Sequence, residues 1–337
     1  MRNILLIALI SCMLIPCIAY SETQTVNVPE IEKNTAPNTS SWPRVSVAGG
    51  YWWTDAKLDV QFLASEPEVS NGVLLANKGD KISELNNDLD AGLYVVTAEA
   101  YLFWRLYVDG FVGWNDFSGE HQDSDWLPAY NPKLWYFSES DATGNVATWD
   151  ANAYIRLIEE KEDKGYLDVG LGYFYYKDDI EHIENSAFKV AEWQPVNIPL
   201  YGHDSSDEFK FDGLRIGAKA LIRLHDRVAI RLNGGVVPWL MVENHRYWNL
   251  REDFGPPPGL RDYGEADGFA FDIDLGLEFK ITKNFYVQGG FKYIDLSADG
   301  GKLKTTWDAM PGYVQTLDHF DVDAHRGGFY IMGRVKI

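Results

Sequence analysis

Two short clusters in the chain carry side chains that could hold and activate a water molecule. In the first, Asp123-Ser-Asp125-Trp126, two carboxylates lie two residues apart, so an extended backbone points them to the same side. Neighbouring carboxylates can share a proton, act as a general base or hold a water. The alternative is a solvated acidic loop, which is common in a chain with 50 acidic and 30 basic residues.

The second cluster is Glu243-Asn-His245, where the acid and the histidine again share one face of an extended segment. A carboxylate beside an imidazole fixes the tautomer of the ring and raises its basicity, which makes the pair a candidate general base. A single histidine in a loop usually has no chemical role. The pair therefore matters only if the fold brings it to the two aspartates of the first cluster.

A third cluster places His319, Asp321, Asp323 and His325 at a spacing of two. On one face of a strand, these side chains could act as metal ligands. The alternative, which we favour, is the solvated extension of a terminal hairpin. The sequence therefore predicts no metal site.

The elements that would position these clusters are indicated by alternating apolar and polar residues. In the last nine residues, Phe329 and Ile331 alternate with Tyr330 and Arg334. A helix cannot place residues of period two on one face, so the pattern predicts strands with one face toward lipid and one toward a polar lumen. The segments with this pattern are 45–53, 94–102, 106–114, 149–157, 167–175, 214–222, 228–236, 269–279, 285–293 and 329–337.

The connections between these segments alternate in length. Tight turns are expected at 225–227 and 282–284, whereas 54–89, 116–148, 177–210, 244–268 and 296–326 are long and polar and are expected to be loops. Short turns on one side and long loops on the other are typical of outer-membrane barrels, with the long loops outside the cell. We therefore predict an all-β fold, a single ten-stranded antiparallel transmembrane β-barrel over residues 43–337.

The N-terminal residues predict export. A basic start, an apolar run and small residues make 1–21 a candidate signal peptide, and the polar segment 22–42 is expected to be flexible. Both cysteines, Cys12 and Cys17, lie in the predicted signal peptide, and Cys12 also leaves a lipoprotein signal as an alternative. The net charge of −20 argues against a nucleic-acid partner, since phosphate binding needs a basic surface.

Together, the first two clusters resemble those of the omptin family, ten-stranded outer-membrane proteases. That family has an Asp-x-Asp-Trp motif after its third strand, intact here as Asp123-Ser-Asp125-Trp126, and an Asp-x-His motif after its seventh, present here as Glu243-Asn-His245. The resemblance implies that Asp123 and Asp125 face a Glu243–His245 dyad across a cleft above the membrane. His245 would activate a water held with Asp123, and that water would attack the peptide carbonyl directly.

The resemblance also implies a bacterial outer-membrane location, a peptide or protein substrate and no cofactor apart from a requirement for lipopolysaccharide. A monomer is expected. Two departures favour an alternative. Glu243 is one methylene longer than the aspartate of the family, and Met241 stands where the family has an acidic substrate-binding residue. The alternative is a non-catalytic barrel of the same fold that serves as an adhesin or structural surface protein.

Overall fold

The computed structural model describes residues 45–337 except 71–72, 104, 127, 130–133, 161–163, 192–193, 199–203, 249–258, 309 and 311. The predicted signal peptide, 1–21, and the lead-in segment, 22–42, lie outside the described residues. The described residues contain no helix long and apolar enough to cross a membrane.

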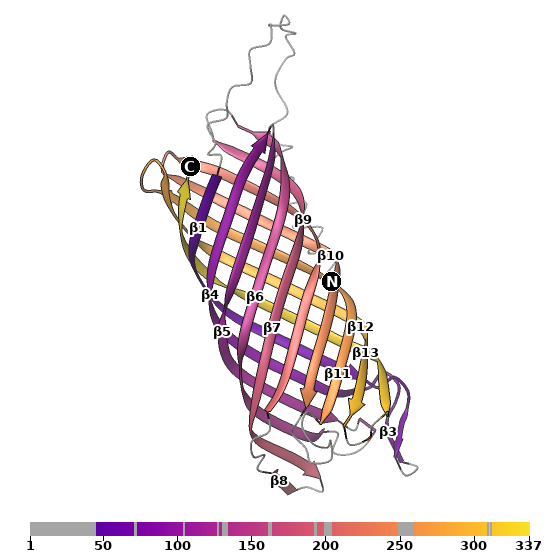
Figure 1. Ribbon diagram of the computed structural model, residues 1–337. Coiled ribbons are helices and arrows are strands. Elements are labelled where there is room, and N and C mark those ends of the chain that lie inside the picture. The colour runs from indigo at the N-terminus through magenta and orange to yellow at the C-terminus, as the bar shows by residue number, and fades with distance from the viewer. Residues whose placement is uncertain are drawn as a thin grey trace, which may run out of the picture. The chain divides into compact units, whose positions relative to one another are not determined.

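Ten long antiparallel strands form a closed barrel, as predicted (Figure 1). Each pairs with its neighbours along the chain, and the first pairs with the last, so no long strand is left with an unpaired edge. The long strands are β1 (Val45–Leu63), β4 (Lys81–Phe103), β5 (Leu106–Trp126), β6 (Leu134–Glu159), β7 (Gly165–Ala191), β9 (Asp204–His225), β10 (Val228–Trp248), β11 (Leu260–Lys280), β12 (Phe285–Trp307) and β13 (Val314–Lys336).

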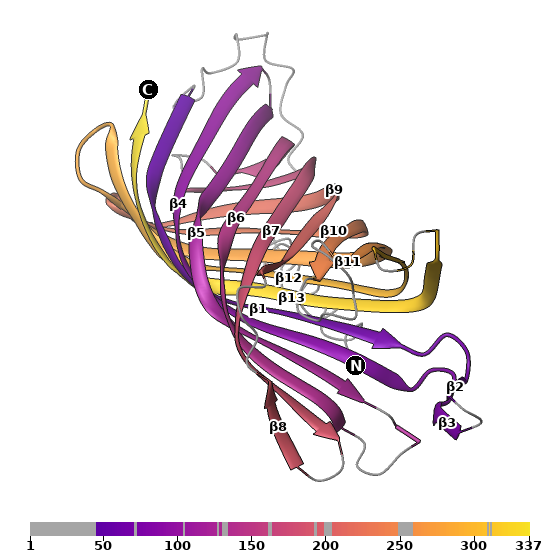
Figure 2. The same cartoon turned by 60° about the horizontal axis from the view of Figure 1, so that its bottom comes forward.

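Three short strands lie in the connections at one end of the barrel. These are β2 (Glu68–Ser70), β3 (Val73–Ala76) and β8 (Gln194–Ile198). Figures 1 and 2 show them at the end opposite to the start of β1 and the C-terminus. We call the end with the start of β1, the C-terminus and the tight turns the turn end, and the other the loop end.

The strands are longer than the sequence pattern predicted, with 19 to 27 residues each. Most of the stretches that we expected to be loops, including 116–126 and 134–148, are strand. A tilted strand crosses a bilayer with about 9–11 residues, so roughly half of each strand extends beyond the membrane. Asp123 and Asp125 consequently lie within β5 and not after it.

Outward-facing apolar side chains concentrate in the ten segments that the alternation identified. In β11, the outward Leu275 is 53% exposed while the inward Asp272 is 7% exposed, which is the predicted arrangement. Paired aromatic rings mark the border of this region toward the loop end: Tyr51–Trp53, Tyr94–Trp114, Trp149–Tyr173 and Phe291–Phe329. We call the region the apolar band, and the remainder of the strands toward the loop end the outer half.

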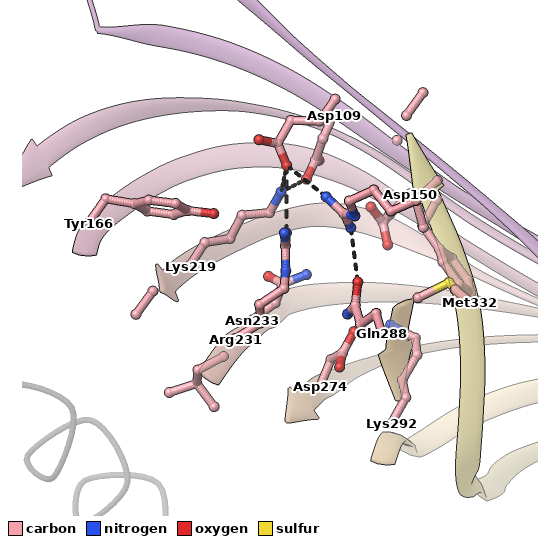
Figure 3. A pocket seen from close by; sticks show the side chains of 18 residues that line it. Asp109, Asp150, Tyr166, Lys219, Arg231, Asn233, Asp274, Gln288, Lys292 and Met332 are labelled. Carbon is pink, nitrogen blue, oxygen red and sulfur yellow. Dashed lines mark hydrogen bonds and ion pairs between the residues drawn. The ribbon is translucent and has the colours of Figure 1, made fainter. Parts of the chain in front are cut away.

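Side chains fill the lumen at the level of the apolar band. Arg215 bonds both oxygens of Asp272 at 2.7 Å, and Lys219 contacts Asp109 across the lumen. Figure 3 shows the cavity among these groups, into which Asp109, Lys219 and Asp274 point from different strands. The cavity measures about 50 Å³, which is room for a few water molecules and far below the volume of a solute channel.

Beyond these ion pairs, an apolar core fills much of the outer half. Inward side chains such as Leu58, Leu89 and Phe209 pack together there and are almost completely buried. At the boundary, Arg326 of β13 donates to Tyr176 Oη and Thr54 Oγ1, at 2.8 Å each, and so connects β13 with β7 and β1. The barrel is therefore a packed body and not an open pore.

The apolar band predicts how charge is tolerated on its outer surface. Leu275→Arg should lower the free energy of unfolding by about 2–4 kcal/mol, because it places a cation in lipid near mid-strand. Asp267→Arg is the matched control, since Asp267 is exposed on the same strand but in the outer half. Urea unfolding in lipid vesicles measures both variants. An equal cost for the two substitutions would show that the band has been assigned to the wrong part of the wall.

Candidate functional site

The structure does not bring the two predicted clusters together. Asp123 of β5 faces inward and is 7% exposed, and Asp125 is half-buried. Glu243 is exposed on the outer face of β10. On that same face, the His245 ring packs edge-on against the Tyr263 ring, with the ring centroids 4.8 Å apart. The Glu243–His245 pair and Asp123 are therefore on opposite faces of the barrel wall, and the arrangement that we expected is wrong.

A single bulge in β10 causes this difference. Within the apolar band, odd-numbered residues of β10 face inward, and continuous alternation would bring 243 and 245 into the lumen. Between Val237 and Leu240, however, the pairing with both β9 and β11 shifts by one residue. An extra residue in one strand exchanges the two faces beyond it. Pro238 lies within the bulge, where its missing N–H does not cost a ladder hydrogen bond.

The third cluster lies on the outer face of β13. His319, Asp321 and His325 are half-buried and Asp323 is exposed. Within the described part of the chain, no group of three or more histidine, cysteine or acidic side chains is arranged to hold a metal ion.

The inward face of the outer half brings two other histidines together. His121 of β5 and His182 of β7 lie with ring centroids 3.9 Å apart, and each is 1% exposed. His121 Nδ1 is 2.9 Å from Asn87 Oδ1 and must carry the proton, because the amide oxygen can only accept. Asn87 in turn donates to the carbonyl of Leu58 at 3.1 Å.

A chain of charged groups continues from His182 around the wall. His182 Nε2 is 3.1 Å from Asp207 Oδ2, and Arg246 Nε donates to the other oxygen of Asp207. Arg246 also lies 3.9 Å from Asp262, which accepts a hydrogen bond of 2.6 Å from Thr305 Oγ1. We call this set the polar belt: Asn87, His121, His182, Asp207, Arg246, Asp262 and Thr305.

The antiparallel register explains why these groups meet. Asp207 is directly opposite Arg246, Arg246 is opposite Asp262, and Asp262 is opposite Thr305. The β10 bulge is what turns Arg246 inward, so the same local feature that removes His245 from the lumen supplies the cation of the polar belt.

Burial and neighbouring charges set the protonation states in the polar belt. Burial lowers the pKa of His121 well below its usual range, with further lowering by His182 and Arg246. Burial alone would raise the pKa of Asp207, but Arg246 and His182 reverse this effect and hold it well below its usual range. Burial also raises the pKa of Asp262, to about 6 against the opposing effect of Arg246. Asp207 is thus the permanent anion of the belt.

Two ring nitrogens in the polar belt remain available. Among the described residues, His121 Nε2 and His182 Nδ1 have no hydrogen-bond partner. Asp207 is ionised and accepts from His182 Nε2, so a neutral His182 ring has its lone pair on Nδ1. His182 and Asp207 therefore form an acid–imidazole pair that could accept a proton from a water, if water reached it.

We compared the chain and its structure with known protein families, sequences and structures. No protein-family model and no curated protein sequence matches the chain. The crystal structure of the outer-membrane protease OmpT from Escherichia coli matches with a TM-score of 0.74 and 12% identity, over 87% of this chain and 96% of that one. The chain has the omptin fold.

Weaker matches include the outer-membrane protein OprG from Pseudomonas aeruginosa (TM-score 0.35, 9% identity, covering 88% of this chain and 97% of that one). The translocator domain of the autotransporter NalP from Neisseria meningitidis has a TM-score of 0.34 and 9% identity over 89% and 90% of the two chains. At this identity the likeness to OmpT extends to the fold alone, so activity depends on the residues of this chain. On its omptin-fold scaffold, the inward face of β10 presents Asn244 and Arg246 instead of a carboxylate and a histidine.

The ion pair at the centre of the polar belt predicts a large effect of its removal. Arg246→Met should lower the free energy of unfolding by about 3–5 kcal/mol, because it leaves Asp207 buried without its main countercharge. Arg246→Met combined with Asp207→Asn should recover part of this loss. Arg261 lies on the outer face of β11, opposite Tyr247, and Arg261→Met should lower the free energy of unfolding by about 1 kcal/mol or less. Urea unfolding of the four proteins checks the order, and equal effects of Arg246→Met and Arg261→Met would contradict it.

Asp262 predicts a pH dependence of stability. Because its pKa is raised to about 6, the folded state holds a proton there above about pH 4, where an unfolded aspartate has lost it. The contribution of Asp262 to the free energy of unfolding should therefore fall as pH rises from 4 to 7, by up to about 3 kcal/mol. Asp262→Asn keeps an acceptor for Thr305 and removes the titration. A difference between wild type and Asp262→Asn that stays constant over this range would refute the assignment.

Proposed function

We propose that the protein is a non-catalytic outer-membrane barrel of the omptin fold that acts as a surface-exposed binding or structural protein. The position of Glu243 and His245 on the outer face of β10 carries this proposal. Because the Glu243–His245 dyad does not face Asp123, the lumen lacks the site on which the omptin resemblance was based. This outcome favours the second of the two functions that the sequence left open.

The proposal includes a location and an orientation. The apolar band with its aromatic border fits a lipid bilayer, and the tight turns at one end with longer connections at the other fit an outer membrane with the loop end outside the cell. The packed ion pairs and apolar core argue against a porin. The partners we propose are outer-membrane lipid, including lipopolysaccharide, around the band and an extracellular ligand at the outer half. The monomer stays a prediction.

One observation supports a second candidate function, an omptin-like endopeptidase with a relocated dyad. His182 and Asp207 form an inward acid–imidazole pair, and Asp123 is on the same inward face, two residues beyond His121 in β5. In such an enzyme His182 would remove a proton from the attacking water through Nδ1, while Asp207 would stabilise the imidazolium that results. The 1% exposure of His182 opposes this function, because water and a peptide would have to reach a sealed layer.

A cleavage assay separates the two functions. Purified protein, reconstituted with lipopolysaccharide and shown to be folded by its heat-dependent mobility on a denaturing gel, is incubated with a broad peptide library. We expect no cleavage above the protein-free control. Cleavage that falls about 10²-fold or more in His182→Ala and persists in His245→Ala would establish the second candidate instead. Cleavage that depends on His245 would overturn both.

A further inference from the structure

A groove of about 390 Å³ lies on the outer face of the wall near the loop end. It crosses β10, β11 and β12 and extends to Val314 at the start of β13. We call it the wall groove. Its outward side chains are His245, Tyr247, Arg261, Tyr263, Lys304 and Thr306.

The strand register builds the wall groove from two adjacent rows of side chains. In the first row Tyr247 is opposite Arg261, and Arg261 is opposite Thr306. In the second row His245 is opposite Tyr263, and Tyr263 is opposite Lys304. Both rows depend on the β10 bulge, because without it Tyr247 and His245 would face the lumen. The bulge therefore presents an aromatic and cationic surface on the outer wall.

The chemistry of the wall groove fits an anion attached to a flat, partly apolar body. Tyr247 is 42% exposed, and the Arg261 guanidinium lies 5.9 Å from the centre of its ring. Arg261 and Lys304 bring two cationic side chains to a chain whose net charge is −20. The carboxylates near the groove lie at its border: Glu265 accepts a hydrogen bond from Tyr263 Oη and Asp308 lies beside Arg261, while the Asp262 side chain is buried inward.

The neighbouring charge leaves Arg261 available to a ligand. Its contact with Asp308 is 3.8 Å long, with the two side chains 50% and 32% exposed, which makes a weak pair in water. The planar guanidinium can bind a carboxylate with two parallel hydrogen bonds, so a ligand carboxylate would compete well with Asp308. Exposed aromatic rings with a few fixed polar groups are also the usual lining of small-ligand sites of this volume.

The wall groove is distant from the lipid headgroups. Trp239 marks the edge of the apolar band on β10, and Tyr247 follows eight residues later. At a rise of ~3.3 Å per residue and a tilt of ~40°, this places Tyr247 about 20 Å beyond the edge of the hydrocarbon layer. The groove therefore lies above the hydrocarbon layer, on the part of the wall that we propose to be outside the cell.

We propose that the wall groove binds a carboxylated sugar at the end of a soluble or foreign-cell glycan. The apolar face of the sugar ring packs on Tyr247 and Tyr263, and the carboxylate pairs with Arg261 and Lys304. The Thr306 hydroxyl forms a hydrogen bond with a sugar hydroxyl. This site deepens the proposed function as a surface binding protein. It does not depend on the absence of catalysis, so the two proposals can fail separately.

The experiment compares sialyllactose with lactose, which lacks the carboxylated sugar, by calorimetry or ligand-observed NMR on the full, detergent-solubilised barrel. We expect sialyllactose to bind at least about tenfold more tightly, with binding weakened by salt. Arg261→Met and Lys304→Met should each weaken it about fivefold or more, and Tyr247→Ala should weaken both sugars. Lys57→Met, an exposed cation on β1 away from the groove, is the control and should leave binding unchanged.

Each other outcome counts against the proposal. Equal affinity for the two sugars, or equal loss in Lys57→Met, would mean that the groove does not recognise the carboxylate. Binding of lipopolysaccharide but of neither soluble sugar would assign the surface to the membrane of the cell itself. Heat-dependent gel mobility confirms that each variant is folded. If sialyllactose fails to bind and the peptide library is also left intact, the glycan site is rejected while the proposed non-catalytic function remains.

Discussion

Charges enclosed by the barrel wall must find partners across the lumen, and the rest of the structure depends on this constraint. A buried charge that loses its partner destabilises a protein by several kcal/mol, and this lumen encloses many. Arg215 connects β9 with Asp272 of β11 and with Asn152 and Tyr154 of β6. Arg326 makes a similar connection from β13 to β7 and β1. Because these contacts span the lumen, an open pore would have to break several of them together.

The bulge at Pro238 determines where the chemistry of this barrel can lie. It turns Arg246 inward, where Asp207 and Asp262 compensate its charge, and it turns His245 and Tyr247 outward. One extra residue in one strand therefore converts what would have been a lumenal acid–histidine pair into part of the outer surface. An omptin-like fold is retained because the bulge leaves β10 paired with both neighbours on either side of it.

The sequence predicted the barrel well and the site poorly, for physical reasons. Alternation is easy to detect where one face is lipid, so all ten membrane segments were identified. Beyond the membrane both faces vary more, and segments such as Asp55–Phe62 were interpreted as loop although apolar residues alternate there too. We expected the two clusters to meet because their facing was taken from the family resemblance, which did not include the bulge at Pro238; a proline within a strand was the available signal for that bulge. His121, His182 and Asp207 come from three strands, and no local motif connects them.

The polar belt and the wall groove are two faces of the same strands. Arg246 and Asp262 are opposite one another on the inner face, and Tyr247 and Arg261 occupy the next register position on the outer face. Any displacement of β10 against β11 would therefore disturb both the buried ion pairs and the outward rows. Since the ion pairs resist such displacement, they hold the backbone positions from which the side chains of the groove extend. Preorganisation of this kind would lower the entropic cost of binding the proposed ligand, and it would connect the buried charges with a site at the surface.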